Sequence, residues 1–574
     1  MTQRRLGVFI CYCGGNISDY VDVEKVRNVV ENEPSVIIAK TNMFTCSDAA
    51  QQEMINEIKD QNLDGIVIAS CSPKLHLSTF RAMAERADLN PYQYTQVNIR
   101  EQCSWAHTHN RDAATEKAIR LVRAGIATTS LSKPLQKLRI ETIPETLVIG
   151  AGVAGLRAAL ALSDMGITVH IVEKSPQAGG TIEKLGKMFP NNKNGSEIIS
   201  SLMDEVRQRE NLTLLVNAEV VEKSGNVGNF SVKVLVNQND TISLNVGSII
   251  VATGFEPYTP VEGEFGFGLD GVITLTEYKE ILSQIRDGLK YKGRDIKTIA
   301  YIYCVGSREH SKQENPNLYC SRYCCSAAVH AALCTDELNI GIHQFHLFRD
   351  MRTYGKYETM YIQALNQNSV FLRYDDSEPP QVITDDGSLK VRVKDRLTGG
   401  EEIEIDSDLV VLVTGMIPRE NDELINVLKL PVGKDGFFNE IHPKLRPVET
   451  VIDGIFIAGA AQSPKTLAES VASSMSAVSK SAALLLKGYV DLEPLVAKVN
   501  PELCTWCGEC METCPYGAVQ RIQVDNKEIA EVNAILCKGE GACVPICPQQ
   551  AIDVEGYTNQ QIKSMIDALV KEVA

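Results

Sequence analysis

The sequence lacks an uninterrupted apolar run of about 18 residues, which is the length that a membrane-spanning helix requires. Its first residues do not show the charged-then-apolar pattern of a secretory signal. Basic residues are in the minority, since 57 Lys and Arg face 73 Asp and Glu, for a formal net charge of −16. Nucleic-acid-binding surfaces are basic, so this balance argues against such a partner. We therefore expect a cytoplasmic protein without a membrane span.

Cysteine, in contrast, is abundant, with 17 among 574 residues. Domains usually hold about 100–200 residues, so the length predicts three or four domains. In a short secreted chain so many cysteines would indicate disulfides, but the lack of a secretion signal favours reduced thiols here. The cysteines are therefore candidate metal ligands.

The cysteines near the C-terminus have the doubled spacing of a two-cluster iron–sulfur ferredoxin. The two segments read C-T-W-C-G-E-C-M-E-T-C-P and C-K-G-E-G-A-C-V-P-I-C-P. Two-residue gaps aim three thiolates at one cluster, whereas the cysteine before proline ligates the other cluster. The first predicted ligand set is Cys504, Cys507, Cys510 and Cys547. The second set is Cys514, Cys537 and Cys543, with Glu540 in the remaining place.

Glu540 stands where the spacing calls for a thiolate. This replacement is compatible with a three-iron cluster, with a four-iron cluster that has a carboxylate or solvent ligand, or with a site that exchanges its fourth iron. A structural zinc site is the alternative for paired cysteines, but the Cys-Pro endings and the internal duplication favour iron–sulfur clusters. The segment therefore predicts electron transfer.

The segment E-T-L-V-I-G-A-G-V-A-G-L-R-A-A-L-A-L, followed by V-H-I-V-E-K, reads as strand, glycine loop, helix and second strand. Small residues in such a loop let the backbone approach a pyrophosphate at a helix N-terminus, and an acid at the end of the second strand binds a ribose hydroxyl. This pattern predicts a dinucleotide site. Its predicted residues are Gly150, Gly152, Gly155, Glu173, Lys174, Gly179 and Gly180.

Two later segments indicate flavin rather than nicotinamide. S-I-I-V-A-T-G ends with Thr253 and Gly254, and G-I-F-I-A-G-A contains Gly459. Both resemble motifs of two-dinucleotide flavoproteins similar to thioredoxin reductase, in which the later motif brings a helix N-terminus to the flavin ring. The helix beginning near Lys465 would then point its positive end at the ring, and Lys465 is a predicted catalytic residue. Buried glycine-ended strands without a flavin are the structural alternative.

The expected nicotinamide domain lacks its glycine loop. The strand I-K-T-I-A-Y-I-Y is followed by C-V-G-S, without a second glycine fingerprint, so NAD(P)H would lack a pyrophosphate cradle. The segment supplies four thiols instead, and we infer that a metal cluster replaces the nicotinamide; inert buried cysteines are the alternative. The predicted ligands are Cys304, Cys320, Cys324 and Cys325. Cys334 receives no role.

Residues 1–130 alternate apolar strands with helical stretches, and each cysteine in this region comes directly after a strand. In a parallel sheet these positions share one edge, where ligands usually bind. This placement predicts a further cluster with four ligands, and chance core cysteines are the alternative. Cys46, Cys71 and Cys103 are the firmer candidates, while Cys11 and Cys13 compete for the fourth place.

Five further segments contain cysteine motifs; they are V-F-I-C-Y-C-G-G-N-I-S-D, T-C-S-D, A-S-C-S-P-K-L-H, N-I-R-E-Q-C-S-W and C-S-R-Y-C-C. Together with the flavin and ferredoxin motifs, and in the same order, they resemble the A-type iron–sulfur subunit of heterodisulfide reductase over nearly the whole chain. This resemblance implies an FAD iron–sulfur protein whose clusters carry electrons to B- and C-type subunits or to a hydrogenase or formate dehydrogenase partner. It also supports the N-terminal cluster and the cluster at Cys304–Cys325. Methanogenic members bifurcate electron pairs between ferredoxin and a heterodisulfide.

Three features depart from this family. A second ferredoxin module, which larger members insert in the flavin domain, is absent. Bifurcating members tend to have a lysine five residues after the Cys-Cys pair, where this chain has His330, a predicted catalytic residue. Lysine favours an anionic flavin through its fixed charge, whereas an ordinary histidine is only partly protonated near neutral pH. Glu540 is the third departure. Bifurcation therefore stays open at this point.

The predicted fold class is α/β, with a thioredoxin-reductase-like two-dinucleotide flavoprotein core, an N-terminal α/β domain and a C-terminal two-cluster (βαβ)2 ferredoxin domain. The predicted segments are an N-terminal cluster domain (1–140), an FAD domain in two parts (141–294 and 405–490), an inserted cluster-binding region (295–404) and the ferredoxin domain with a C-terminal helix (491–574).

The predicted function is that of an FAD- and [4Fe-4S]-dependent electron-transfer protein with about four clusters, working within a heterodisulfide-reductase-like complex. Expected partners are B- and C-like subunits, an electron-input hydrogenase or formate dehydrogenase, ferredoxin, and a second copy in a homodimer. One alternative is an NAD(P)H-dependent disulfide or glutamate-synthase-like reductase, which requires a nicotinamide cradle and, for disulfide reduction, a C-x-x-C beside the flavin. The core contains neither. A non-catalytic scaffold is a third reading, which predicts broken ligand sets.

Overall fold

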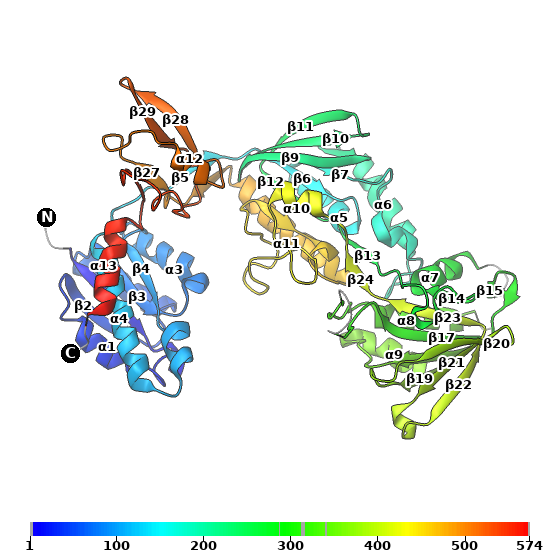
Figure 1. Cartoon of the computed structure of the whole chain (residues 1–574). Coiled ribbons are helices and arrows are strands. Elements are labelled where there is room, and N and C mark those ends of the chain that lie inside the picture. Colours follow the sequence, from blue (N-terminus) through cyan, green and yellow to red (C-terminus); the bar gives the residue numbers. More distant parts are fainter. Residues whose placement is uncertain (1–3, 286–287, 311–315, 339–340, 572–574) are drawn as a thin grey trace. The chain divides into compact units, whose positions relative to one another are not determined.

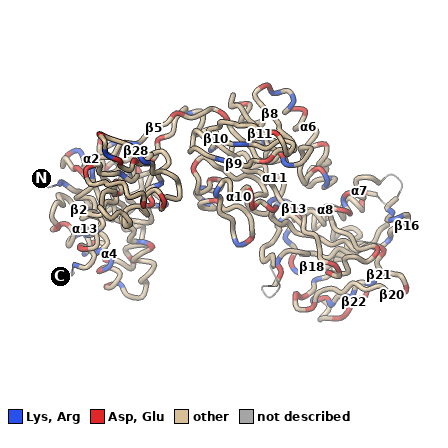
Figure 2. The backbone as a smooth tube through the Cα atoms, turned by 45° about the horizontal axis from the view of Figure 1, so that its top comes forward, with Lys and Arg blue, Asp and Glu red and all other residues tan. Residues whose placement is uncertain are grey.

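The computed structural model describes residues 4–285, 288–310, 316–338 and 341–571. The chain forms two compact units, each of which is described by itself: Met1–Ile140 with Asp491–Ala574, and Glu141–Val490. The N-terminal and ferredoxin segments, which the sequence presents as separate domains, thus belong to one unit. Acidic and basic residues are interspersed along the backbone of each unit (Figure 2). No helix in the described ranges is long and apolar enough to cross a membrane.

The N-terminal part of the first unit is a four-stranded parallel sheet with the order β2-β1-β3-β4 (Figure 1). Its strands are β1 (Leu6–Cys11), β2 (Val36–Asn42), β3 (Gly65–Ser70) and β4 (Tyr94–Asn98). Both central strands, β1 and β3, are buried along their whole length, as continuous apolar runs in a parallel sheet are. The connecting helices are α1 (Val23–Val30), α2 (Asp48–Asp60), α3 (Pro73–Arg86) and α4 (Arg111–Ser130).

The ferredoxin part of this unit is built from two antiparallel strand pairs. They are β27 (Ala497–Val499) with β30 (Ile552–Val554), and β28 (Val519–Val524) with β29 (Lys527–Val532). Helix α12 (Glu509–Thr513) lies in the first ligand loop, and α13 (Asn559–Val570) packs along α4 (Figure 1). The Gln561 side chain of α13 donates to the backbone carbonyl of Thr128 at 3.5 Å. The C-terminal helix therefore fastens the ferredoxin to the N-terminal sheet.

The second unit contains a five-stranded parallel sheet with the order β25-β12-β6-β7-β8. Its strands are β6 (Glu145–Ile149), β7 (Thr168–Val172), β8 (Leu212–Leu215), β12 (Ser248–Val251) and β25 (Ile455–Ile457). Helix α5 (Val153–Asp164) packs against α11 (Leu467–Leu486), and α6 (Gly195–Arg207) packs beside α5. An antiparallel meander precedes β12 and consists of β9 (Ala218–Asn226), β10 (Asn229–Val236) and β11 (Asp240–Val246).

A second five-stranded parallel sheet in this unit has the order β14-β23-β17-β18-β19. Its strands are β14 (Val272–Thr274), β17 (Thr298–Val305), β18 (His343–Phe348), β19 (Ser369–Arg373) and β23 (Leu409–Thr414). Strands β14 and β23 lie outside residues 295–404 in sequence, so this domain is wider than the predicted insertion. Because β23 pairs directly with β17, it belongs to this sheet and not to the sheet that contains β6.

The two sheets of the second unit are joined by the antiparallel pair β13 (Phe255–Pro257) and β24 (Met416–Pro418). The helices of the second domain are α7 (Leu275–Gln284), α8 (Cys324–Asp336) and α9 (Glu358–Leu365). Its meander is β20 (Gln381–Asp385), β21 (Ser388–Lys394) and β22 (Glu402–Ser407). The remaining elements are β5 (Leu138–Glu141), β15 (Lys290–Tyr291), β16 (Arg294–Asp295), α10 (Asp422–Leu428) and β26 (Tyr489–Leu492).

Candidate functional site

A pocket of about 580 Å³ opens at the carboxyl ends of strands β6, β7 and β12, which is where nucleotides bind to open α/β sheets. Its volume lies within the range of cofactor sites. Most of the predicted dinucleotide residues line it. These are Gly150, Gly152, Glu173, Lys174, Gly179, Gly180, Thr253, Gly254 and Lys465. Gly155 and Gly459 are not among the lining residues.

The three loop glycines have different physical tasks. A Cβ on Gly155 would lie 1.9 Å from the carbonyl oxygen of Gly150, so this glycine allows the helix to pack on the loop. Gly150 has a φ of 105°, which favours glycine. A Cβ on Gly152 would meet nothing within 4 Å, and Gly152 lines the pocket at the N-terminus of α5. Gly152 therefore leaves room for a pyrophosphate to approach the free N–H groups of α5.

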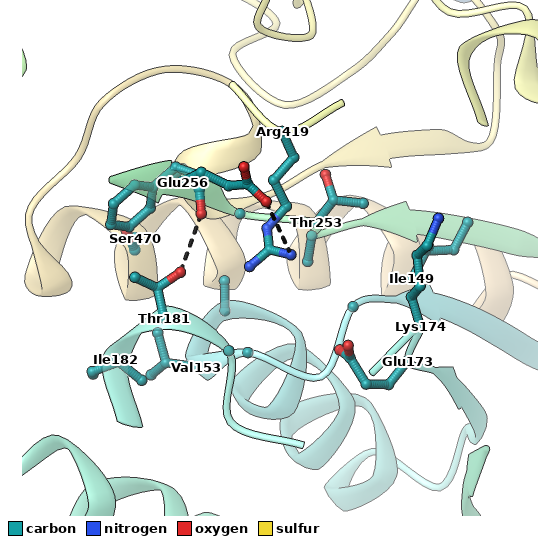
Figure 3. Close-up of a pocket in the computed structure, with 18 of the residues that line it drawn as sticks. Ile149, Val153, Glu173, Lys174, Thr181, Ile182, Thr253, Glu256, Arg419 and Ser470 are labelled. Carbon is teal, nitrogen blue, oxygen red and sulfur yellow. Dashed lines mark hydrogen bonds and ion pairs between the residues drawn. The ribbon is translucent and has the colours of Figure 1, made fainter. Parts of the chain in front are cut away.

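Glu173 lies at the end of β7, where the fingerprint predicts a ribose ligand. Its carboxylate accepts hydrogen bonds from the backbone N–H of Ala151 at 2.7 Å and of Ser175 at 2.9 Å. The side chain is buried yet lines the pocket. Glu173 thus fixes the glycine loop to the strand end and presents a carboxylate toward the cavity (Figure 3).

Two polar atoms in the pocket wall point to a ligand. Among the described residues, Thr253 Oγ1 and Arg419 Nε are buried without a hydrogen-bond partner. In Figure 3, Arg419 and Glu256 lie on the opposite side of the cavity from Val153, Thr181 and Ile182. Arg419 follows β24 directly and is only loosely paired with Glu256, at 4.0 Å. No sequence motif predicts that Arg419 lines the pocket. It reaches the pocket because β24, which follows the second sheet in sequence, pairs with β13 beside the pocket.

Lys465 extends into the pocket just before α11. Its Nζ donates to Ser463 Oγ at 2.8 Å and to Gln462 Oε1 at 3.2 Å, and burial lowers the pKa of Lys465 to about 8. Thr466 caps α11 by accepting from the backbone N–H of Glu469. A lysine and a helix N-terminus therefore meet at the pocket, and both favour negative charge on a bound group.

His330 lies outside the residues that line this pocket. It is buried on α8, its Nε2 is 2.6 Å from Asn192 Oδ1, and Phe189, which does line the pocket, packs against its ring. Burial and the nearby charges of Lys279 and Lys187 lower the pKa of His330 to about 4. This histidine is therefore neutral near pH 7, in contrast to the partial protonation of an ordinary histidine.

The four thiols of the second domain converge at the end of β17. Cys304 is near the end of this strand, Cys324 and Cys325 open α8, and Cys320 lies in the loop between them. The pKa of Cys324 is raised by its hydrogen bond with Cys325, by burial and by the charges of Cys325, Cys304 and Cys320. The adjacent Tyr323 lines the flavin pocket. One of the four predicted ligands, Cys324, is therefore the direct neighbour in sequence of a residue that lines the pocket.

Two arginines flank Cys304. Arg308 Nη1 lies 3.9 Å from Cys304 Sγ, and Arg308 is held by an ion pair with Asp350 at 2.7 Å. Arg349 donates to the carbonyl oxygens of Ser307 at 2.9 Å and Arg308 at 2.8 Å. Burial raises the pKa of Cys304, while the charges of both arginines lower it. This thiol group thus lies in a cationic environment that favours added negative charge.

Three of the N-terminal cysteines, Cys11, Cys13 and Cys71, lie close enough for their charges to interact. Burial raises the pKa of Cys71 to about 11, the charge of Arg100 lowers it, and the charges of Glu101, Cys13 and Cys11 raise it. Arg100 Nη1 also donates to Cys13 Sγ at 3.7 Å. These effects place Cys11, Cys13 and Cys71 within electrostatic reach of each other. Cys46 lies in the loop after β2.

Cys103 is fully buried in the core of the N-terminal sheet, together with Cys11. Burial raises its pKa to about 11, and the charge of Lys117 lowers it. Among the described residues, no other cysteine contributes to the pKa shift of Cys103, so the charge interactions link Cys71 to Cys11 and Cys13 but not to Cys103.

In the ferredoxin, each predicted set comes together. One small cavity is lined by Cys504, Cys507, Cys510 and Cys547. The pKa of Cys543 is raised to about 11 by burial and by the charges of Cys537, Cys510 and Cys514. Backbone N–H groups donate to four of the thiols at 3.3–3.4 Å; these are Cys504, Cys514, Cys537 and Cys547. Over the described part of the chain, no group of three or more His, Cys, Asp or Glu is arranged to hold a single metal ion.

Two segments of the chain match known protein families. Residues 144–302 match the pyridine nucleotide-disulphide oxidoreductase family, and residues 497–548 match the 4Fe-4S dicluster domain. Among solved structures, thioredoxin reductase from T. acidophilum is similar with 19% identity and a TM-score of 0.40, over 60% of this chain and 99% of that one. The fold and the two family matches define a flavin- and iron–sulfur-dependent oxidoreductase, as predicted.

The curated relatives are similar over almost the whole chain. The second A-type iron–sulfur subunit of CoB–CoM heterodisulfide reductase from Methanopyrus kandleri is 35% identical over 92% of both chains. The A-type subunit of the H(2):CoB-CoM heterodisulfide,ferredoxin reductase from Methanothermobacter marburgensis is 34% identical, over 90% of this chain and 91% of its own. This chain therefore belongs to the family of A-type heterodisulfide reductase subunits. The expected resemblance is confirmed.

Proposed function

We propose that this chain passes electrons between a bound FAD and iron–sulfur clusters inside a heterodisulfide-reductase-like complex. The observation that carries the proposal is the adjacency of Tyr323 and Cys324, since Tyr323 lines the flavin pocket and Cys324 belongs to the four-thiol group. Flavin exchanges electron pairs as well as single electrons, whereas a cluster passes one electron at a time. Because Tyr323 and Cys324 are adjacent, a flavin in the pocket and a cluster on the four thiols would lie close to each other.

The residues of the chain have distinct tasks in this scheme. Gly152 and the N-terminus of α5 would receive the FAD pyrophosphate, Glu173 a ribose, and Lys465 with α11 the ring. The buried, unpartnered Thr253 Oγ1 and Arg419 Nε supply further polar contacts. Phe255 packs against Tyr323 with 6.2 Å between ring centroids, and both residues line the pocket. These aromatic rings would exclude water from the wall of the pocket beside Cys324.

The thiol groups would hold four clusters. Those of the second unit are Cys304, Cys320, Cys324 and Cys325, and those of the N-terminal sheet come from Cys11, Cys13, Cys46, Cys71 and Cys103. The ferredoxin sets are Cys504, Cys507, Cys510 and Cys547, and Cys514, Cys537 and Cys543 with Glu540. Four buried or partly buried backbone N–H···S contacts would stabilise thiolate charge there.

The names of the relatives indicate the kind of partner. The Methanothermobacter marburgensis relative is named for H(2), CoB-CoM heterodisulfide and ferredoxin, and a Methanococcus maripaludis relative for H(2) or formate with the same acceptors. We propose B- and C-like subunits, an electron-input hydrogenase or formate dehydrogenase, ferredoxin and a second copy of this chain as partners, in the cytoplasm. Electron bifurcation is decided by measuring whether the purified complex reduces ferredoxin together with a second acceptor or only one of them.

An NAD(P)H-dependent reductase is disfavoured by the packing at the end of β17. A Cβ on Gly306 would lie 2.1 Å from the ring of Tyr258, so this turn is filled by an aromatic side chain. Cys304 and Arg308 occupy the surrounding positions. A nicotinamide nucleotide would need a phosphate-binding loop at this turn. The Tyr258 ring and Cys304 occupy that space instead.

The test compares Cys324→Ser with Cys334→Ser after anaerobic purification with partners. Both residues lie on α8, but only Cys324 belongs to the four-thiol group. We expect Cys324→Ser to keep FAD and lose one cluster signal in electron paramagnetic resonance (EPR) spectra, together with electron transfer from flavin. Cys334→Ser should keep both. Equal effects of the two substitutions, or full flavin-to-cluster transfer in Cys324→Ser, would overturn the proposal.

A further inference from the structure

The ferredoxin part is internally duplicated, so each position around one cluster site has a counterpart around the other. The loops C-T-W-C-G and C-K-G-E-G place Glu540 at the position of Cys507. The segments C-P-Y-G-A and C-P-Q-Q-A place Tyr516 at the position of Gln549. The first site has four thiols, and it supplies a reference for the second.

The two ligand loops have similar backbone φ angles at the residues before and after Cys507 and Glu540. Trp506 and Gly539, which precede Cys507 and Glu540, have φ angles of 50° and 69°. The glycines that follow, Gly508 and Gly541, have φ angles of 84° and 76°. The backbone therefore presents the Glu540 side chain to the second site in the same way as it presents the Cys507 thiol to the first site.

The sulfur contacts repeat as well. Cys504 and Cys537 each accept a backbone N–H at 3.4 Å, from Ala530 and Ala497 respectively. Cys547 and Cys514 each accept one from the alanine four residues later, at 3.3 and 3.4 Å. The second site is thus built like the first, apart from its one carboxylate.

Tyr516 forms a hydrogen bond with the Glu540 carboxylate. Its hydroxyl donates a short hydrogen bond to Glu540 Oε1. Tyr516 follows Cys514 by two residues, and Glu540 follows Cys537 by three. This hydrogen bond therefore joins the two chain segments that carry these thiols of the second set. With Oε1 engaged, Oε2 is the oxygen left to bind a metal.

We propose that Glu540 is the fourth ligand of the second cluster through Oε2, that Tyr516 is its positioning residue, and that this site releases and regains its fourth iron. The inference rests on the proposed function, which supplies the cluster. A glutamate arm is longer and has more rotatable bonds than a cysteine arm, so the hydrogen bond to Oε1 restricts the positions that Oε2 can take. Carboxylate oxygen is a harder ligand than thiolate and suits iron–sulfur clusters less well.

The chemical step is balanced without an external oxidant. The bond between Oε2 and iron breaks together with the sulfide bonds of that iron, and one ferrous ion leaves. The three remaining irons keep Cys514, Cys537 and Cys543 as ligands, and the number of electrons on them does not change. Added ferrous ion reverses the step. One-electron oxidation by ferricyanide then makes the three-iron form visible in EPR.

The experiment uses the full chain in its complex and measures the rate at which a ferrous-iron chelator produces the three-iron EPR signal. The variants are Tyr516→Phe, Glu540→Cys and their combination, with Gln549→Leu as the matched change at the intact site. Tyr516 is 37% exposed, and phenylalanine keeps its ring, so folding is preserved. The flavin and the remaining cluster signals report on the proposed function independently.

We expect Tyr516→Phe to speed iron loss several-fold and Glu540→Cys to abolish the three-iron signal. Tyr516→Phe should have no further effect in the Glu540→Cys background, and Gln549→Leu should leave iron loss unchanged. An unchanged rate in Tyr516→Phe, or an equal acceleration in the Glu540→Cys background, would overturn the role of Tyr516. Persistence of the three-iron signal in Glu540→Cys would overturn ligation by Glu540. Absence of every cluster signal would overturn the proposed function instead.

Discussion

Replacing Arg308 by glutamine should lower the reduction potential of the cluster that we propose at Cys304. Arg308 Nη1 lies 3.9 Å from Cys304 Sγ, and its side chain is only 20% exposed. A reduced cluster carries one more negative charge than an oxidised one, and a fixed guanidinium stabilises that charge. Glutamine removes the cation and keeps a side chain of similar reach, so the reduced form becomes less favourable.

The size of the shift follows from Coulomb's law. Two unit charges 4 Å apart interact by about 4 kcal/mol at the effective dielectric constant of about 20 that suits such sites. The added electron is shared among four thiolate-bound irons, so roughly a quarter, about 1 kcal/mol, acts through Cys304. For one electron this corresponds to about 40 mV. The ion pair of Arg308 with Asp350 offsets part of it, so we expect a fall of about 20–40 mV.

The assay is an EPR-monitored redox titration of the anaerobically purified complex. Arg308→Lys, which keeps the charge, should stay near the wild-type potential. Arg373→Gln is the matched control, because Arg373 also pairs with Asp350 but directs its Nε to the carbonyl oxygen of Arg349. A potential that does not fall in Arg308→Gln, or an equal fall in Arg373→Gln, would refute the electrostatic reasoning.

Two further predictions concern the second unit. Gly152→Ala should leave folding intact, because its Cβ meets nothing within 4 Å, yet weaken FAD binding about tenfold or more, which fluorescence titration measures. Gly155→Ala should instead destabilise the fold by about 1–3 kcal/mol in chemical denaturation, since its Cβ would lie 1.9 Å from Gly150 O; equal FAD loss with equal stability in both variants would contradict this division. Burial lowers the pKa of Lys279 to about 8, so below pH 8 this lysine is charged in both the folded and the unfolded state, and the folded state carries the desolvation cost. Lys279→Met should therefore stabilise the protein by about 3 kcal/mol at pH 7, an advantage that shrinks as the pH rises from about 8 to 10, and a constant or growing advantage over that range would contradict the pKa shift.

The ferredoxin ligand sets and the glycine fingerprint could be predicted from the sequence because their geometry is local. Two-residue gaps in one loop fix where three thiols point, whatever surrounds the loop. The order of strand, glycine loop and helix similarly fixes Gly150, Gly152 and Glu173 around one pocket. In both cases the structure brings together what the spacing grouped.

The remaining site residues depend on contacts between distant segments. Arg419 reaches the flavin pocket from the end of the second domain, and Tyr516 meets Glu540 from the other half of the ferredoxin. Neither contact has a sequence signature. His330 received a predicted catalytic role from its position five residues after the Cys-Cys pair. In the structure it lies on α8, where Phe189 and Asn192 contact it, and it does not line the pocket.

The most direct test of the central claim is quantitation of FAD and iron in the anaerobically purified chain with its partners, joined to EPR at stepped potentials. The account predicts FAD together with several distinct cluster signals, one of which disappears in Cys324→Ser and another of which changes in Glu540→Cys. FAD with the ferredoxin signals alone, and no signal that depends on Cys324, would contradict an electron route that begins beside the flavin.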